Sequence, residues 1–327
     1  MRSRLLTTTA LYAALAVAPA TAFADPVTLT ILASAAISAG GAAFATSAAL
    51  GFVSMALAPK PKKPRVTEGG FVQNNVGSNL DHAIIYGETR VGGVVFYAST
   101  SNNDTILHRM IAVAGHEVES YVKYYLNDDE LTLDGNGLCT APSRFAGKVF
   151  IESKTGTDNQ TAVDLYGFGS PVSLPSGSDE WTQNHRARGI AYIYSALQFD
   201  SAAFPNGTPL LTAVVKGRKV FDPRNSSTAW SENAALCIRD YLTSDFGLDC
   251  DADEIDDVAF ADAANDCDQT VTLAAGGTQK RYTANGSFTT AVTPNDAITQ
   301  MLTSIKGYLE LRREPGTRPH CHTMKMI

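Results

Sequence analysis

The amino-acid sequence predicts an α+β protein rich in β-strands, with small β-barrel or sandwich-like domains, inserted strands and a few short helices, preceded by apolar N-terminal helices. Runs of β-branched and aromatic residues recur, separated by turn signals at intervals of about a dozen residues. The 26 glycines and 12 tyrosines are typical of strands joined by tight turns. Beyond the N-terminal region, apolar residues at helical spacing appear only after residue 228.

The length and charge of the chain limit the classes of protein that it can represent. Its 327 residues allow about two domains. The net charge of −7 argues against a basic surface that follows phosphates, so we expect no nucleic-acid specificity. Five cysteines lie far apart without a CxxC pair. This spacing argues against a disulfide scaffold and a structural zinc site, and favours reduced cysteines.

The first 64 residues are predicted to form a separate apolar segment. Residues 1–24 resemble a secretory signal, with two arginines, an apolar run and a small-residue cleavage pattern before Asp25. Residues 27–58 are apolar, rich in Ala and Gly, and carry no charge. This run is long enough to cross a bilayer, or it forms helices packed in an assembly. Residues 59–64 read as a stiff linker of Pro and Lys.

Residues 65–180 are predicted to form a first β domain. Residues 83–97 read as two short strands, with Gly87, Gly92 and Gly93 marking a bulge or turn. Further strands are expected where β-branched and aromatic residues recur between turns, at 107–114, 118–126, 149–152 and 162–166.

Residues 181–309 are predicted to form a second, α+β domain. Strands are expected at 190–199, and at 210–215 and 219–221 around the turn Lys216-Gly-Arg218. An apolar face predicts a helix from Trp230 to Leu242, with Gly247 after its end. A second helix is expected over 252–262, burying Ile255, Val258 and Ala259. Two strands are expected at 269–273 and 281–291. A third helix should begin after the cap Thr293, with Pro294 at its first position.

No constellation of residues predicts a catalytic, cofactor or metal site. The segment from Asp245 to Asp268 carries ten carboxylates, and its start resembles a calcium loop. Glu254 and Phe260 then stand where that loop needs Gly and Glu, so we expect a solvated acidic surface. No nucleophile elbow or phosphate loop is present. Convergence of His185, Asp200 and Asp222 in one pocket would favour catalysis.

Several stretches taken in order resemble one family. They begin with Ala-Pro-Lys-Pro-Lys at 58–62 and continue through Ile85-Tyr-Gly-Glu-Thr-Arg-Val-Gly-Gly, Phe204-Pro-Asn-Gly, Val-Lys-Gly-Arg-Lys-Val-Phe-Asp-Pro-Arg at 215–224 and Thr228-Ala-Trp-Ser-Glu-Asn. Across about residues 45–309, this order is similar to the tail tip attachment, or host-specificity, protein of lambda-like long-tailed phages. That protein is the central hub of the tail tip.

The resemblance implies a homotrimeric, non-enzymatic hub in the virion tail tip or baseplate, made of β-barrel-like domains that contact other tail-tip proteins. It implies no catalytic residue, no metal and no cofactor. The residues expected to act in structure and assembly are those that carry the motifs: Tyr86, Gly87, Arg90, Gly92, Gly93, Pro205, Asn206, Gly207, Lys216, Gly217, Asp222, Pro223, Trp230, Leu236 and Tyr241.

Two features depart from this family. Residues 310–327 read as an atypical tail without the expected strand, as in a shortened prophage gene. Residues 1–24 resemble an export signal, which a protein assembled in the bacterial cytoplasm does not need. The alternative is therefore an exported, periplasmic or membrane-anchored bacterial binding protein, held at the membrane through 27–58. In the hub interpretation, residues 27–58 could instead contact the host membrane. A cell-wall hydrolase is the third interpretation.

Overall fold

The computed structural model describes residues 74–76, 81–175, 180–305, 307–312 and 320–326. The signal-like residues 1–24, the apolar run 27–58 and the linker 59–64 lie outside the described residues. Among the residues that are described, no helix is both long and apolar enough to cross a membrane.

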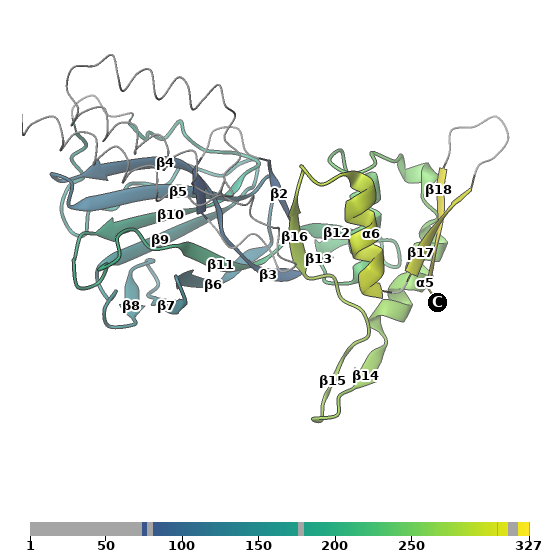
Figure 1. Ribbon diagram of the computed structural model, residues 1–327. Helices are drawn as coiled ribbons and strands as arrows, with labels where there is room; N and C mark the ends of the chain where they lie inside the picture. Colours follow the sequence, from purple (N-terminus) through teal and green to yellow (C-terminus); the bar gives the residue numbers. More distant parts are fainter. Residues whose placement is uncertain (1–73, 77–80, 176–179, 306, 313–319, 327) are drawn as a thin grey trace, which may run out of the picture. The chain divides into compact units, whose positions relative to one another are not determined.

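Two five-stranded sheets contain most of the strands (Figure 1). The first has the order β1 (Asn74–Val76), β4 (Gly93–Ser101), β5 (Ile106–Ala114), β10 (Ala191–Gln198) and β9 (Val149–Thr155). The second has the order β3 (Glu88–Val91), β11 (Leu211–Lys216), β6 (Ser120–Leu126), β7 (Asp129–Leu133) and β8 (Cys139–Ala141). The pairing is antiparallel except between β1 and β4.

Side chains from both sheets form one hydrophobic core. Ile111 and Ile193 contribute from the first sheet, and Leu211, Ala213 and Val215 from the second. The alternation of these positions follows from the two-residue period of a strand. Both sheets draw strands from either side of residue 180, because β10 lies between β5 and β9 in the first sheet and β11 lies between β3 and β6 in the second.

The connection between β9 and β10 covers the outer face of the first sheet. Tyr192 and Tyr194, both fully buried, pack there with Val163 and Trp181. The indole Nε1 of Trp181 donates a hydrogen bond to the carbonyl oxygen of Val163 at 3.0 Å. The prediction of a strand at 162–166 is wrong, because these residues cover the sheet without joining a ladder.

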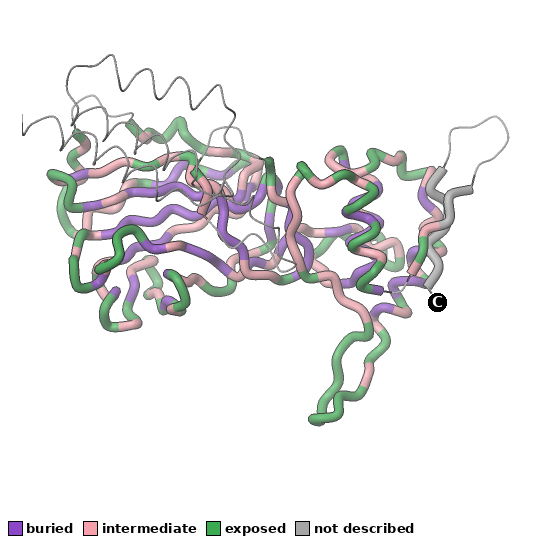
Figure 2. Tube along the Cα trace, in the orientation of Figure 1, coloured by how far each residue is buried: buried purple, intermediate pink, exposed green. Residues whose placement is uncertain are grey.

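A second core lies among three helices, α4 (Ala234–Thr243), α5 (Asp257–Asp268) and α6 (Pro294–Ile305) (Figures 1 and 2). A short 3-10 helix, η1 (Ala252–Glu254), precedes α5. Three hairpins accompany the helices: β12 (Lys219–Asp222) with β13 (Ser227–Trp230), β14 (Thr270–Thr272) with β15 (Thr278–Lys280), and β17 (Gly307–Arg312) with β18 (His320–Met326). The strand β16 (Gly286–Thr289) pairs with β2 (Ala83–Tyr86).

The β-rich α+β fold with a few short helices is confirmed. The start of α6 is also as predicted, because the Thr293 hydroxyl accepts a hydrogen bond from the backbone N–H of Asp296. The C-terminal residues differ from the prediction of a tail without a strand, since β17 and β18 form a hairpin.

Several local predictions are wrong at their boundaries. Trp230 ends β13, and α4 starts only after Asn233, whose side-chain oxygen accepts from the N–H groups of Ala235 and Leu236. That helix ends at Thr243 and its C-cap Ser244 is extended, so Gly247 is not its C′ residue. The second predicted helix, α5, spans Asp257–Asp268 rather than 252–262. Val258 is exposed because the buried face of α5 is made by Phe260, Ala263, Ala264 and Cys267.

The strands predicted around Lys216-Gly-Arg218 exist but do not pair with each other. β11 lies between β3 and β6, whereas β12 pairs with β13. The chain therefore leaves one sheet at this turn and enters the hairpin beside the helices, and the turn connects the two cores.

Candidate functional site

Strand β2 contributes to both hydrophobic cores. Ile85 packs in the core between the sheets, whereas Ile84 and Tyr86 pack in the core among the helices. Neighbouring side chains of a strand point to opposite sides, so a single strand serves both cores. In the ladder with β16, Ser287 lies opposite Ile85.

The turn at Gly217 lies directly against β2. The backbone N–H of Gly217 donates to the carbonyl oxygen of Gly87 at 2.7 Å, and that of Arg218 donates to the carbonyl oxygen of Ile85 at 2.9 Å. A Cβ atom on Gly217 would lie 2.2 Å from the Ile85 carbonyl oxygen. Gly87 has a φ of +63°, which favours glycine. The close approach of the turn to β2 therefore requires glycine at 217, and the positive φ favours it at 87.

Trp230 lies over the same turn. Its indole Nε1 donates a hydrogen bond to the carbonyl oxygen of Gly87 at 3.2 Å. The ammonium group of Lys216 lies 4.4 Å from the centroid of the Trp230 ring, a cation–π contact. Four residues predicted from three separate stretches of the sequence, at positions 87, 216, 217 and 230, are thus neighbours in the fold.

A charged network joins β2, this turn and α4. The Tyr86 hydroxyl donates to Oδ2 of Asp240 at 2.6 Å, and Nε of Arg218 donates to the same oxygen at 2.7 Å. Burial, reinforced by the Asp240 carboxylate, raises the pKa of Tyr86 well above its usual value. The Arg218 guanidinium also lies over the Phe246 ring, 5.0 Å from its centroid. The Tyr86 side chain and the Arg218–Asp240 ion pair therefore hold β2 against α4.

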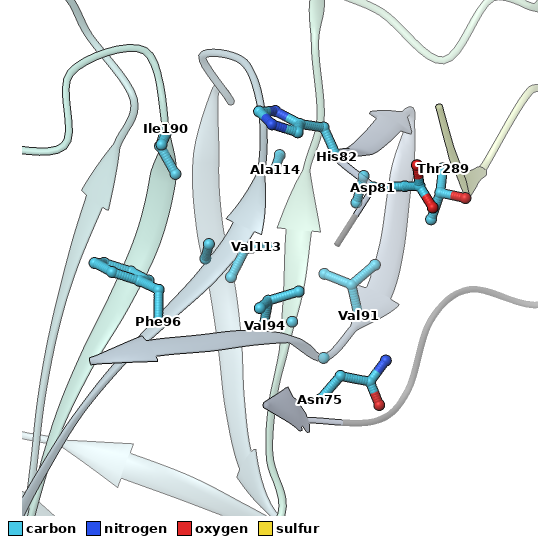
Figure 3. A pocket seen from close by; sticks show the side chains of 15 residues that line it. Asn75, Asp81, His82, Val91, Val94, Phe96, Val113, Ala114, Ile190 and Thr289 are labelled. Atoms are coloured by element: carbon cyan, nitrogen blue, oxygen red, sulfur yellow. The ribbon is translucent and has the colours of Figure 1, made fainter. Parts of the chain in front are cut away.

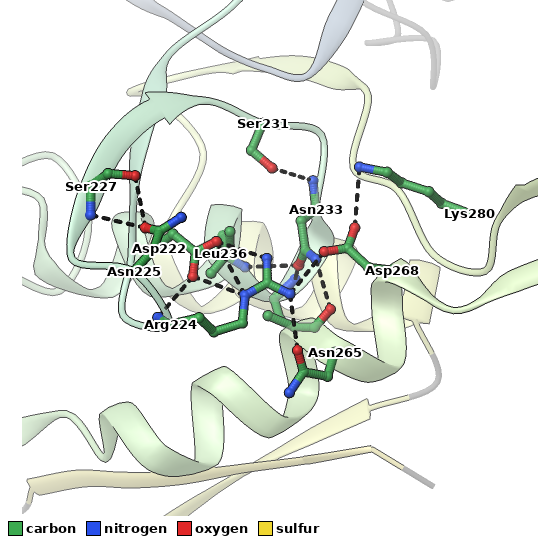
Figure 4. A network of polar contacts seen from close by, with 12 residues as sticks. Asp222, Arg224, Asn225, Ser227, Ser231, Asn233, Leu236, Asn265, Asp268 and Lys280 are labelled. Carbon is green, nitrogen blue, oxygen red and sulfur yellow. Dashed lines mark hydrogen bonds and ion pairs between the residues drawn. The ribbon is translucent and has the colours of Figure 1, made fainter.

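A second network lies between the β12–β13 hairpin and the helices (Figure 4). Arg224 donates to both carboxylate oxygens of Asp222, with Nη2 2.7 Å from Oδ2, and its Nη1 lies 2.9 Å from Oδ2 of Asp268 in α5. Lys280 pairs with the other oxygen of Asp268 at 3.1 Å. The hydrogen bond from Arg224 lowers the pKa of Asp222, and the same bond raises the pKa of Arg224. This network holds the hairpin against α5.

The remaining predicted site residues occupy other positions. Leu236 and Tyr241 are buried among the helices, and Pro223 lies in the turn after β12. Nε of Arg90 donates to the Thr212 hydroxyl between β3 and β11. The three predicted residues of the loop after β10 are exposed: Pro205, Asn206 and Gly207.

Gly92 and Gly93 line a pocket of about 430 Å³ (Figure 3). The side chains of Asp81 and Thr289 lie on one side of it, and Phe96 and Ile190 lie on the other. The pocket is therefore mostly apolar with a polar margin.

The three residues whose convergence would favour catalysis have separate partners. His185 accepts from the backbone N–H of Thr182, Asp200 pairs with Lys148 at 2.6 Å, and Asp222 pairs with Arg224. Within the described part of the chain, no group of three His, Cys, Asp or Glu side chains could hold a metal ion.

The site residues predicted from the sequence do not include Arg218, Arg224, Asn233 or Asp240. Asn233 had a readable signal, because an Asn directly before an apolar helical run is a preferred N-cap. The pairing of Asp240 with Tyr86 joins residues 154 positions apart, so no local pattern indicates it.

Comparisons with known proteins give few matches. No protein-family model matches the sequence, and no curated protein matches it. Among solved structures, the chain is similar to a protein chain in the virion of the native gene transfer agent (GTA) particle, with a TM-score of 0.44 and 13% sequence identity. The similarity covers 83% of this chain and 62% of that chain. At this identity and TM-score, the similarity assigns neither a function nor a partner.

Proposed function

We propose that this chain is a non-catalytic structural component of a phage tail tip, namely the N-terminal part of a baseplate hub that serves tail assembly and host attachment or DNA delivery. One observation carries the proposal. Three residues from separate hub-like stretches meet at the turn that connects the two cores, because Gly217 and Trp230 both donate a hydrogen bond to the carbonyl oxygen of Gly87. Stretches that resemble the hub family in sequence are thus neighbours in the fold. We call the contact of Gly87, Gly217 and Trp230 the joint.

The chemistry of this joint is suited to support rather than to catalysis. Asp240 has its Oδ2 atom committed to Tyr86 and Arg218, and the Trp230 N–H is committed to a backbone carbonyl group. Asp222 is committed to Arg224. Groups that satisfy one another in this way stabilise a fixed geometry, which a ring of identical subunits needs.

The test is substitution of Trp230 in the full chain. Trp230→Ala removes the hydrogen bond to Gly87 and the cation–π contact with Lys216, so tail-tip assembly or solubility should fall. Trp230→Phe is the matched control, because it keeps the aromatic face for Lys216 and removes only the N–H donor. Incorporation of each variant into sedimenting tail particles is the measurement. Normal incorporation of the Ala variant would refute the assembly role.

The proposed partners are other tail-tip or baseplate proteins and two further copies of this chain. Analytical ultracentrifugation of the full chain should give a trimer mass. Genes for tape-measure and minor tail proteins should flank its own gene. A chain that stays monomeric at all concentrations, encoded away from tail genes, would contradict the proposal.

A second candidate function rests on the signal-like residues 1–24 and the apolar run 27–58. They favour an exported, membrane-anchored bacterial binding protein. Mass spectrometry of the N-terminus separates the two functions. A mature chain that starts at Asp25 supports export and contradicts assembly in the cytoplasm, whereas an intact N-terminus supports the hub.

A further inference from the structure

An arginine buried in the first sheet has an incomplete set of partners. Arg109, in β5, is 5% exposed. Its Nη1 atom donates a hydrogen bond to the carbonyl oxygen of Pro209 at 3.0 Å. Its Nε and Nη2 atoms have no hydrogen-bonding partner among the described residues. A buried guanidinium with unused donors is costly, because it has lost its hydration without full compensation.

The unused donors lie together on one edge of the guanidinium. In the planar group, the Nε–H bond and one Nη2–H bond point the same way and form a fork. Such a fork matches the two oxygens of a carboxylate, with two parallel charge-assisted hydrogen bonds. The pattern of satisfied and unsatisfied atoms therefore indicates an oxyanion as the missing partner.

The Arg109 side chain borders a space that can hold such a partner. Its Nε and Nη2 atoms are themselves buried, so the side chain has to turn towards that space to bind it. Arg109 lines a pocket of about 420 Å³. Arg109 is the charged residue among those described around this pocket, and most of the others are apolar: Val76, Val95, Ala98, Leu107, Pro209 and Leu210. One guanidinium balances one negative charge, so the lining favours a monoanion attached to an apolar group over a doubly charged phosphate.

Two further features support a built site. Ser195 of β10 is the direct cross-strand partner of Arg109, and its buried hydroxyl also has no partner among the described residues. Cross-strand partners share a face of the sheet, so this hydroxyl lies on the side of Arg109. Asn74 fixes the edge of the pocket, since its side chain accepts from the N–H of Leu211 and donates to the Leu211 carbonyl oxygen.

We propose that this pocket binds a carboxylate carried on a short apolar group, with the Nε and Nη2 atoms of Arg109 as its bidentate donors. The natural source is a protein segment, either the end of a chain or an acidic side chain. Burial lowers the pKa of Arg109 to about 10, so the guanidinium is charged at neutral pH. This site is independent of the joint at Gly217 and does not rest on the proposed hub function.

The test uses the full chain and butyrate as the probe, with butyramide as the uncharged control. Butyrate should raise the midpoint of thermal unfolding and shift the Nε–H resonance of Arg109 in NMR spectra, at constant ionic strength. Butyramide should do neither. Equal effects of the two compounds, or no shift with butyrate, would overturn the proposal.

The variants give an independent readout. Arg109→Met should abolish the butyrate effect and, without ligand, should keep or raise the unfolding midpoint, because it removes an uncompensated charge. Arg239→Met is the matched control: Arg239 is 6% exposed but paired with Asp257 at 2.7 Å. This control should lower the midpoint and keep the butyrate effect. An unchanged butyrate effect in Arg109→Met would overturn the proposal.

If Arg109→Met does not fold, Arg109→Lys serves instead. This variant keeps the positive charge but has no pair of parallel N–H donors, so its affinity for butyrate should fall about tenfold. N-acetylleucine represents a chain end, and the α-amide of N-acetylglutamate represents an acidic side chain. The tighter binder identifies the source, while tighter binding of inorganic phosphate than of every carboxylate would contradict the assigned ligand class.

Discussion

The hydroxyl of Tyr86 lies 2.6 Å from Oδ2 of Asp240, and this hydrogen bond connects strand β2 to helix α4 across 154 positions of sequence. Arg218 donates to the same oxygen, so the carboxylate is shared between a strand and a turn. The interaction makes the packing of β2 against the helices specific, and its energetic contribution can be measured.

Replacing Tyr86 by Phe should lower the free energy of unfolding by about 1–2 kcal/mol, because a partly buried hydrogen bond to a charged group is lost while the Arg218–Asp240 pair remains. Denaturant titration measures the change. Tyr125→Phe is the control, since the Tyr125 hydroxyl donates to the exposed Glu130 at 3.1 Å. Tyr125→Phe should lower the free energy of unfolding by only about 0–1 kcal/mol. Equal losses in the two variants would show that the buried bond has no special role.

Gly217→Ala should destabilise the protein by more than about 2 kcal/mol, because the added Cβ atom meets the backbone carbonyl of Ile85 and one of the two segments must move. Gly286→Ala is the control, since a Cβ atom at that position meets nothing within 4 Å. Its effect should stay within about 1 kcal/mol. Thermal unfolding of both variants checks this, and a Gly217→Ala protein as stable as the control would contradict the tight contact.

Two buried histidines should make the protein less stable in mild acid. Burial lowers the pKa of His108 and of His116 to about 4. Between the ordinary value of 6.5 and about 4, the unfolded chain binds protons that the folded chain does not. The contribution of each histidine is therefore fully present above the unfolded pKa. It is lost as the pH falls towards 4, by up to about 1.4 kcal/mol per pH unit.

His116→Gln should reduce this pH dependence. The Nε2 atom of His116 accepts from the backbone N–H of Ile85 at 3.0 Å, and a Gln oxygen can also accept without titrating. Stability measured at several pH values between 7 and 4.5 should fall less steeply in the variant. The same slope in both proteins would show that folding does not lower the pKa of His116.

The Asp222–Arg224 pair should contribute at neutral pH and disappear in strong acid. The pKa of Asp222 is lowered in the folded state by Arg224, so its contribution is complete above the unfolded value of about 3.9 and is lost as the pH falls through the folded value. Asp222→Asn should therefore be less stable than the natural chain at pH 7. The difference should vanish at low pH, whereas a constant difference at every pH would exclude the ion pair as its cause.

Local patterns predicted the fold class and the helix that begins after Thr293, because propensities and caps act within a few residues. The strand at 162–166 was wrong because its β-branched and aromatic residues pack on the outer face of a sheet without entering a ladder. Trp230 fits a helical spacing but belongs to β13, where it contacts Gly87 and Lys216. Only tertiary contacts distinguish these cases.

The candidate sites also differ in how far the sequence predicts them. The glycines at 87 and 217 stood out in the sequence as turn residues, and the structure places them in contact. The pocket beside Arg109 gives no sequence signal, because an arginine in a β run reads as a solvent-facing position. Its character follows from the loop at Pro209, which lies a hundred residues further along the chain.

The partner of β2 appears late during synthesis. Tyr86 leaves the ribosome two hundred residues before Gly286, its neighbour in the β16 ladder. At about 5–20 residues per second, the apolar edge of β2 therefore waits about 10–40 s for its cover. Synonymous changes that slow the ribosome between codons 90 and 286 should therefore increase aggregation of the nascent chain.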